Sequence, residues 1–387
     1  MLMRFEQTEE HGGNIHRASW VLNKGTEDIL DFSANINPLG IPEALKEVLL
    51  SNMDLLAHYP DPEYIRLRSR LSEYAGVPAQ NIIPGNGSSE IIFLLLDVLK
   101  PENILIPAPS FSEYEKAAKN AGIDIRFLEL REEEDFRLNV RRIINEIKTG
   151  MKCVILCNPN NPTSTLVPKE EMLHIAEAAS RCGTVLVVDE AFIELTVGGI
   201  DNSVTGFVRK YDNLFVIRAF TKVFAVPGLR LGYGIGNELL AAKMRLVQQP
   251  WSVNAFAACA ADFLPQADEY LKKTEAWLKT EKEWLYENLC LIPGLKVYKP
   301  QTNFILAKLP GNGIDAAILK ESLMRRGILI RDASNFRYLD RSFFRVAVKD
   351  RQANQRLVDA LKILIMKNVG AENISETGEV IRDAGIN

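Results

Sequence analysis

The chain has 387 residues, of which 47% are hydrophobic and 25% are charged, a composition typical of a globular protein with one large and one smaller domain. Its 46 basic and 50 acidic side chains leave a net charge of -4, which offers no electrostatic footprint for nucleic acid or for an anionic membrane. We therefore expect the partner to be a small molecule.

The ends of the chain and its cysteines bear on location. The first residues, MLMRFEQTEEHGG, lack the apolar run of a signal peptide, and the longest apolar stretch, near residues 91–99, is too short to span a bilayer. The five cysteines, at positions 153, 157, 182, 259 and 290, include no C-x-x-C pair and leave one thiol over in any disulfide scheme. Both features favour a cytoplasmic protein with reduced thiols.

The first part of the chain predicts an arm followed by a large domain. Residues 1–45 contain the turn-rich run 35–40 and little periodicity, which predicts an extended arm leading into a helix after Pro42. Residues 46–280 alternate between helical segments and short β-branched runs, at 103–107, 123–130, 153–157, 184–188, 214–218 and 231–235. Several of these runs are apolar throughout, as strands covered on both faces should be. The pattern predicts a three-layer α/β domain with a mostly parallel sheet.

Residues 281–387 predict a smaller α+β domain. A charged helix near 268–288 leads into expected strands at 295–298, 302–309, 328–331 and 343–348, with a helix at 314–326. We expect the N-terminal arm to complete this domain. The polar stretch 367–387 is predicted to be a loosely held tail.

Two side chains near predicted strand ends could carry chemistry. Asp189 directly follows the buried strand 184–188, at the edge where open α/β sheets bind their ligands. Lys222 follows the strand 214–218 and precedes a Gly/Pro turn that ends in Arg230. Taken alone, such an acid is more often a cap for the next turn and such a lysine is usually solvated. Their combination favours a shared pocket.

Six motifs in order resemble the signature of fold-type I pyridoxal-phosphate enzymes of the aspartate aminotransferase superfamily. They are GNGSSE (85–90), PSFSEY (109–114), NPNNPT (158–163), DEAF (189–192), TK (221–222) and PGLR (227–230). The resemblance covers essentially the whole chain. It implies a pyridoxal 5'-phosphate cofactor, which needs an anion cradle, a ring clamp, a partner for the ring nitrogen and an amine.

The resemblance implies that five residues form the phosphate cradle. Gly87, Ser88 and Ser89 open a helix, so their backbone N–H groups and hydroxyls can bind an anion at its positive end. Thr221 and Arg230 would complete the cradle, the guanidinium through paired hydrogen bonds. Without the resemblance, residues 87–89 are an ordinary helix start.

The resemblance also assigns the residues around the cofactor ring. Lys222 would be the Schiff-base lysine, and Asp189 would keep the pyridine nitrogen protonated. Asn161 would donate to the ring 3-oxygen and Phe111 would stack on the ring face, although an aromatic residue beside a turn is more often plain core. Phe192 departs from the family pattern, since many relatives carry tyrosine there.

The segment HYPDP (58–62) resembles a family segment whose tyrosine reaches the cofactor phosphate of the neighbouring subunit. This implies that Tyr59 crosses between subunits of a homodimer with shared active sites. With Phe192 in place of the usual phenol, Tyr59 or Asn161 would have to supply the missing contact to the ring oxygen.

Within the superfamily, the chain is similar to the threonine-phosphate decarboxylases of the cobalamin pathway and to the histidinol-phosphate aminotransferases. The arm segments HGGN (11–14) and DFSANINPLG (31–40) look like the decarboxylase group. The resemblance implies decarboxylation of L-threonine O-3-phosphate to (R)-1-aminopropan-2-ol O-phosphate and carbon dioxide. Transamination stays open, because the choice depends on which α-carbon bond is held perpendicular to the ring, and sequence does not fix that orientation.

Two arginines suit a substrate with a carboxylate and a phosphate. Arg345, in FFRVA (343–347), matches the family arginine that binds the α-carboxylate, and Arg331, in ILIRD (328–332), matches one that approaches a distal phosphate. Asn35, His11 and Arg17 could close over the substrate from the arm. Each of these three is more often structural or exposed when taken alone.

Other classes of function fit poorly. The run GYGIG (232–236) lacks the third glycine of a dinucleotide fingerprint at the right spacing, which argues against a dehydrogenase. A ligand sensor built on an aminotransferase-like domain usually adds a DNA-binding segment, and no such segment is evident. The four histidines, at 11, 16, 58 and 174, form no zinc pattern, and no P-loop spacing occurs. We therefore expect no metal.

Overall fold

The computed structural model describes residues 12–311 and 313–376, with the backbone alone described for 367–376. A seven-stranded sheet forms the centre, in the order β2-β8-β7-β6-β5-β3-β4. Its strands are β2 (Ile82–Asn86), β3 (Asn103–Ala108), β4 (Asp124–Glu129), β5 (Cys153–Cys157), β6 (Val185–Asp189), β7 (Leu214–Ala219) and β8 (Leu231–Ile235). Strand β8 is antiparallel to both neighbours, whereas the other neighbouring pairs are parallel. The predicted α/β class with a mostly parallel sheet is confirmed.

The sequence pattern does not predict β2. This strand contains Pro84 and Gly85, and both residue types weaken a strand signal. A proline cannot donate to the ladder, so it is tolerated at a sheet edge. β2 occupies such an edge, with β8 as its hydrogen-bonded neighbour.

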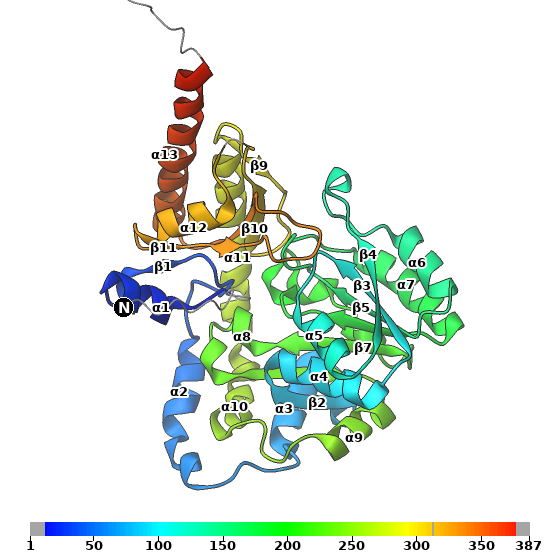
Figure 1. Ribbon diagram of the computed structural model, residues 1–387. Helices are drawn as coiled ribbons and strands as arrows, with labels where there is room; N and C mark the ends of the chain where they lie inside the picture. Colours follow the sequence, from blue (N-terminus) through cyan, green and yellow to red (C-terminus); the bar gives the residue numbers. More distant parts are fainter. Residues whose placement is uncertain (1–11, 312, 377–387) are drawn as a thin grey trace, which may run out of the picture.

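Helices cover both faces of the large sheet, which gives the three predicted layers (Figure 1). Alternate residues of β6 point to opposite faces, with Leu186 and Val188 in one core and Val187 in the other. The first face is covered by α3 (Ile65–Ala75), α6 (Val140–Lys148), α7 (Lys169–Cys182) and α10 (Ala255–Ala260). The second face is covered by α4 (Gly87–Leu99), α5 (Glu113–Asn120) and α9 (Glu238–Val247).

The smaller α+β part is built on a four-stranded antiparallel sheet in the order β12-β13-β10-β9. Its strands are β9 (Lys296–Val297), β10 (Phe304–Lys308), β12 (Arg331–Asp332) and β13 (Phe343–Ala347). Three helices pack on it, α11 (Asp268–Cys290), α12 (Ala316–Met324) and α13 (Arg351–Glu376). Helix α11 contributes to both the large and the small core, so it crosses the predicted boundary at residue 280 without a break. The domain limits stay a prediction.

The N-terminal arm differs from the predicted extended chain because residues Ile15–Leu22 form helix α1. The side chain of Asn14 caps it by accepting from the amide of Arg17, a local signal that the periodicity analysis missed. Helix α2 (Glu43–Ser51) begins after Pro42, as predicted. Strand β1 (Leu30–Asp31) pairs in parallel with β11 (Ile328–Leu329), so the arm does join the small domain.

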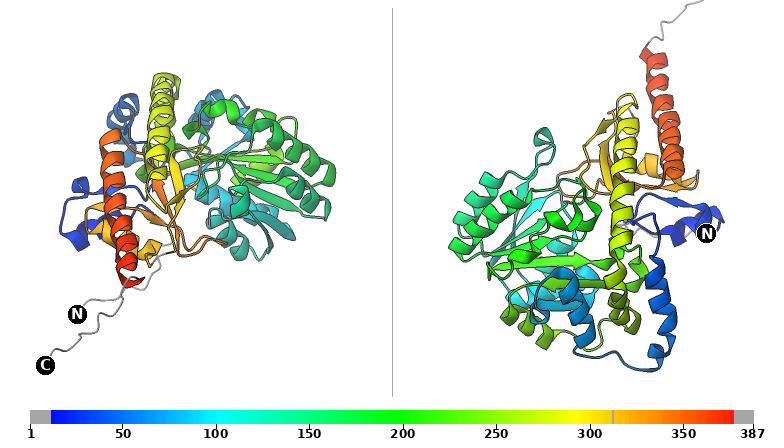
Figure 2. Two further views of the ribbon diagram at one scale, coloured as in Figure 1. Left: turned by 90° about the horizontal axis from the view of Figure 1, so that it is seen from above. Right: turned by 180° about the vertical axis from the view of Figure 1, so that it is seen from behind.

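Two predictions near the C-terminal half are wrong in their limits. The expected single strand 328–331 divides at Ile330, because β11 pairs with β1 whereas β12 pairs with β13. The predicted tail begins too early, because α13 continues to Glu376 and projects away from the body of the protein (Figure 2). Residues 377–387 lie outside the described residues. Among the residues described, no helix is long and apolar enough to cross a bilayer, and the five cysteines are free thiols.

Candidate active site

Most of the predicted site residues line one cavity of about 470 Å³. These residues are Asn35, Ser88, Ser89, Phe111, Asn161, Asp189, Lys222, Arg230, Arg331 and Arg345. The carboxylate lies at the end of β6, the amine lies in the segment directly after β7, and the small sheet contributes two arginines from β12 and β13. The cavity therefore lies where the two parts of the chain meet.

Asp189 is the last residue of β6 and is almost fully buried. Its Oδ2 accepts a hydrogen bond from the Tyr114 hydroxyl at 2.7 Å, and its Oδ1 accepts one from the Ala191 amide at 2.9 Å. Burial raises the pKa of Asp189, and these two hydrogen bonds oppose that effect by stabilising the charged form. The site thus holds an oriented carboxyl group at the strand end that the sequence predicted.

Lys222 lies in the short helix α8 (Phe220–Val223), which follows β7 directly. Burial lowers the pKa of Lys222 to about 8, and the positive charges of Arg345 and Arg230 add to this effect, while Asp31 opposes it. Roughly a tenth of the amine is therefore neutral at pH 7. A neutral amine is the form that can attack an aldehyde carbon.

The start of α4 packs tightly against its neighbours. Gly87 has a φ of +77°, and a Cβ there would lie 2.4 Å from Nη2 of Arg230. A Cβ on Gly232 of β8 would lie 2.3 Å from the Ser88 amide nitrogen. The absence of side chains at these two glycines lets the helix start, the guanidinium and β8 converge. Ser88, Ser89 and Arg230 line the cavity, which is the donor set that an anion needs.

The two predicted substrate arginines are both buried. Arg345 donates through Nη1 to Oδ1 of Asn161 and through Nη2 to the Ser33 carbonyl at 2.8 Å. Its Nε is buried without a hydrogen-bond partner among the described residues. Arg331 donates to Oδ1 of Asn335 at 2.7 Å, and its guanidinium lies 5.2 Å from the ring centre of Phe336. Both guanidiniums line the cavity, where they could contact an anionic substrate.

Some predicted site residues lie elsewhere. Thr221 is buried next to Lys222 but does not line the cavity. Tyr59 is 80% exposed and stacks on Trp251 with 4.5 Å between ring centres, outside the cavity. Arg17 lines an adjoining cavity of about 480 Å³ instead. His11 lies outside the described residues.

Several further residues line the cavity without a role predicted from the sequence. Tyr114 comes three residues after Phe111, and the two rings make an edge contact with centres 5.7 Å apart. Cys157 ends β5 directly opposite Asp189 in the sheet, and burial raises the pKa of its thiol to about 12. Asn335 and Phe336 follow Arg331. Tyr114 lies in the first turn of α5, whereas Phe111 precedes that helix, so helical spacing gives no signal that links them.

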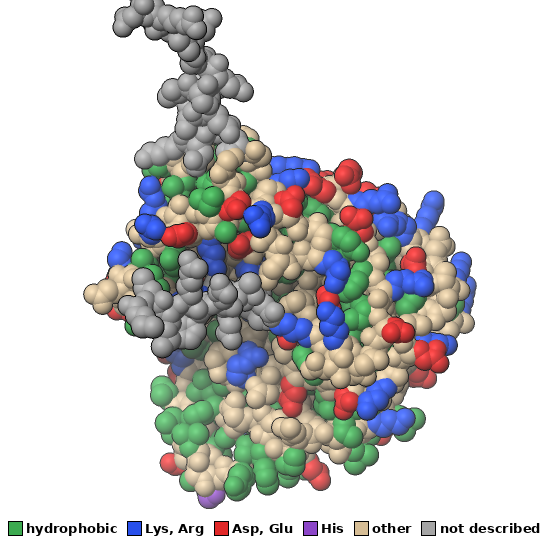
Figure 3. Space-filling model, viewed as in Figure 1, with side chains coloured by type: hydrophobic (Ala, Val, Ile, Leu, Met, Phe, Trp, Pro, Cys, Tyr) green, Lys and Arg blue, Asp and Glu red, His purple; other side chains and the backbone are tan. Residues whose placement is uncertain are grey.

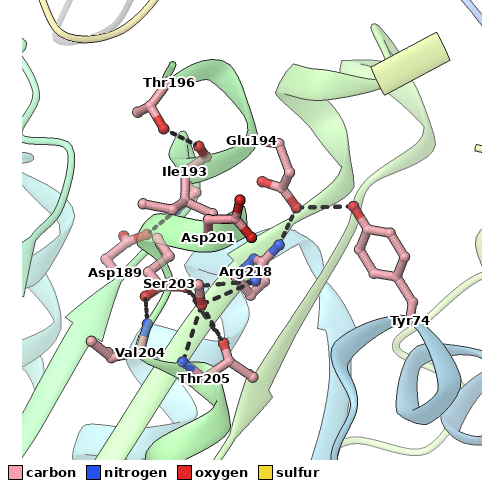
Figure 4. A network of polar contacts seen from close by, with 12 residues as sticks. Tyr74, Asp189, Ile193, Glu194, Thr196, Asp201, Ser203, Val204, Thr205 and Arg218 are labelled. Atoms are coloured by element: carbon pink, nitrogen blue, oxygen red, sulfur yellow. Dashed lines mark hydrogen bonds and ion pairs between the residues drawn. The ribbon is translucent and has the colours of Figure 1, made fainter. Parts of the chain in front are cut away.

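A buried ion-pair network supports the segment that follows Asp189 (Figure 4). Arg218, 3% exposed at its side chain, pairs with Glu194 and lies 3.6 Å from Oε2 of Glu190. Glu190 in turn accepts from the Ser203 hydroxyl at 2.5 Å and from the Val204 amide at 2.8 Å. Glu190, the residue beside Asp189, is therefore anchored to β7 and to residues 203–204, which precede β7, and this fixes the end of β6.

Comparison with known proteins identifies the family of the chain. The family model for aminotransferase class I and II matches residues 27–361. The chain belongs to this family. A protein of Caldanaerobacter subterraneus subsp. tengcongensis, named provisionally as a threonine-phosphate decarboxylase, is 43% identical over 93% of this chain and 95% of its own.

Two further relatives are named for two different types of reaction. The threonine-phosphate decarboxylase of Salmonella typhimurium is 38% identical over 91% of this chain and 95% of its own length. The crystal structure of a histidinol-phosphate aminotransferase from Clostridium acetobutylicum has a TM-score of 0.81 and 38% identity, and covers 88% of this chain and 100% of that one. Both reaction types therefore occur among similar members of the family.

Proposed function

We propose that the protein is a pyridoxal-phosphate-dependent decarboxylase that converts L-threonine O-3-phosphate to (R)-1-aminopropan-2-ol O-phosphate and carbon dioxide in cobalamin biosynthesis. One observation carries the proposal: a single cavity brings together the amine of Lys222, the carboxylate of Asp189 and two buried arginines. An amino acid with a carboxylate and a distal phosphate matches the two guanidiniums. The similarity to two threonine-phosphate decarboxylases supports this substrate.

The residues present fit pyridoxal phosphate. The helix start at Ser88 and Ser89, pressed against Arg230 where a Cβ on Gly87 would collide, offers amides, hydroxyls and a guanidinium to the phosphate. Asp189 would hold the ring nitrogen and Lys222 would supply the amine. Asn161 uses its oxygen for Arg345, so its amide nitrogen remains as the donor to a ring oxygen.

When bound, the cofactor supplies an electron sink for the pair of electrons left at the substrate α-carbon after a bond there breaks. Arg345 would hold the α-carboxylate and Arg331 the phosphate, which fixes the orientation of the α-carbon between them. Lys222, with a pKa of about 8, can exist as an amine or as an ammonium near neutral pH. Its ammonium form can deliver a proton to the α-carbon once the carboxylate has left.

We also propose a cytoplasmic homodimer with shared active sites. Exposed apolar side chains gather over α2 and the segment after it, including Leu50, Leu56, Tyr59 and Ile65. Figure 3 shows hydrophobic side chains concentrated over this lower part of the molecule. A patch of this kind is typical of a subunit interface. Tyr59 points out of its own subunit, as a residue serving a neighbouring site must.

The test uses the pyridoxal-phosphate-loaded protein and L-threonine O-3-phosphate labelled with carbon-13 in the carboxylate. We expect labelled carbon dioxide together with the amino alcohol phosphate, and no carbon dioxide from a Lys222→Ala variant that retains its fold. L-Threonine with the same carboxylate label serves as the substrate control and should react far more slowly, because it lacks the phosphate that Arg331 is proposed to bind. Decarboxylation by Lys222→Ala at the wild-type rate would contradict the proposal.

The second candidate is a histidinol-phosphate aminotransferase. The similarity to the Clostridium acetobutylicum structure favours it, and histidinol phosphate would also present a phosphate to Arg331. The presence of Arg345 does not distinguish a decarboxylase from an aminotransferase, because the amino donor or acceptor of a transamination also carries a carboxylate. Formation of glutamate from 2-oxoglutarate during the reaction would identify this alternative.

A further inference from the structure

The hydroxyl of Tyr114 is placed to act on the carboxylate of Asp189. Tyr114 lies on α5 with 0% of its surface exposed, so its hydroxyl has no solvent to bond. It donates to Oδ2 of Asp189 at 2.7 Å across 75 residues of sequence. Phenylalanine would fill the same space and keep the edge contact with Phe111, so packing alone does not account for the hydroxyl.

Hydrogen bonds stabilise the charged form of the Asp189 carboxylate. Among the described residues, the bonds to this carboxylate come from Tyr114 and from the Ala191 amide. The neighbouring Cys157 stays a neutral thiol, because burial and Asp189 itself raise its pKa to about 12. A hydrogen bond donated to a carboxylate stabilises the ionised form and makes the group a weaker base.

We propose that Tyr114 is a positioning residue that keeps Asp189 ionised and aimed at the ring nitrogen of the cofactor, so that the shared proton stays on the nitrogen. This inference rests on the proposed pyridoxal-phosphate site. Without the hydroxyl, the carboxylate binds the proton more strongly and draws it away from the ring. The ring then withdraws electrons less effectively, so turnover falls while substrate affinity is unchanged.

The experiment compares Tyr114→Phe with a matched control, Tyr298→Phe. Tyr298 is also buried and donates to a carboxylate, that of Glu132, at 2.8 Å, but it lies outside the cavity. Each protein is loaded with pyridoxal phosphate labelled with nitrogen-15 in the ring, and the chemical shift reports whether that nitrogen is protonated. We expect the resonance of Tyr114→Phe to move toward the unprotonated value and that of Tyr298→Phe to match the wild type.

Kinetics supply the second measurement. We expect kcat for threonine phosphate to fall roughly tenfold to a hundredfold in Tyr114→Phe, the effect of losing one hydrogen bond to a charged group, with KM unchanged. Replacing Tyr114 with 3-fluorotyrosine, whose more acidic hydroxyl donates more strongly, should move the nitrogen resonance in the opposite direction. No movement of the resonance in either variant would overturn the proposal.

The two proposals can fail separately. The nitrogen-15 measurement needs the cofactor but no substrate, so it stands even if threonine phosphate is not decarboxylated. In that case, the kcat comparison would be made with the substrate that the enzyme does use. If the wild-type protein binds no pyridoxal phosphate, the proposed function and this inference are both wrong.

Discussion

Replacing Lys222 with methionine should stabilise the cofactor-free protein at pH 7 and should stabilise it much less at pH 10. Burial, with Arg345 and Arg230 nearby, lowers the pKa of Lys222 from 10.5 to about 8 in the folded chain. A group with a lower pKa in the folded state destabilises the fold fully at pH values below that pKa, and the penalty disappears as the pH rises toward the unfolded value. The lowered pKa of Lys222 destabilises the folded state by about 3 kcal/mol at pH 7 and by about 1 kcal/mol at pH 10.

The assay is urea unfolding of the two cofactor-free proteins at pH 7, 8.5 and 10. The free energy of unfolding of the wild type is subtracted from that of the variant at each pH, so groups that titrate in both proteins cancel. Lys272→Met, at an exposed position on α11, is the control and should give a difference that does not change with pH. A Lys222→Met difference that is equally flat would refute the account of a buried, weakly basic amine.

Three further outcomes are expected. Arg218→Met leaves its buried carboxylate partners uncompensated and should lower the free energy of unfolding by about 3–5 kcal/mol, whereas Arg181→Met, at an exposed ion pair, should change it by less than about 1 kcal/mol. Arg331→Lys should lower kcat/KM for threonine phosphate about tenfold or more, mainly through KM, with no effect on L-threonine. Inactive Tyr59→Ala and Lys222→Ala chains, reassembled in equal amounts, should regain about a quarter of wild-type activity, which separate sites would not allow.

Much of the large sheet could be predicted because its central strands are apolar on both faces. Strands β5 and β8 begin and end where the β-branched runs do, and the carboxylate after β6 lies at the edge where parallel strands present their ligands. The edge strand β2 was not predictable in this way, since Pro84 and Gly85 interrupt its pattern. The motifs also select residues that line one cavity, including Lys222, Asp189 and Arg230.

Contacts between segments that are distant along the chain could not be predicted from the sequence. Tyr114 and Asp189 are far apart along the chain, and a single sequence carries no signal that their side chains meet. The network around Arg218 joins β7 to two glutamates in the same way. Position along the chain likewise could not show that Arg17 lines the adjoining cavity and not that of Lys222. Such pairings follow from topology, which the periodicity of each element does not specify.

The central claim is that this cavity decarboxylates a phosphorylated amino acid, and one competition measures it directly. The pyridoxal-phosphate-loaded protein is given L-threonine O-3-phosphate, histidinol phosphate and 2-oxoglutarate in the same tube, and carbon dioxide and glutamate are measured over time. We predict that carbon dioxide accumulates with little glutamate. Glutamate without carbon dioxide would contradict the claim and would identify the protein as an aminotransferase.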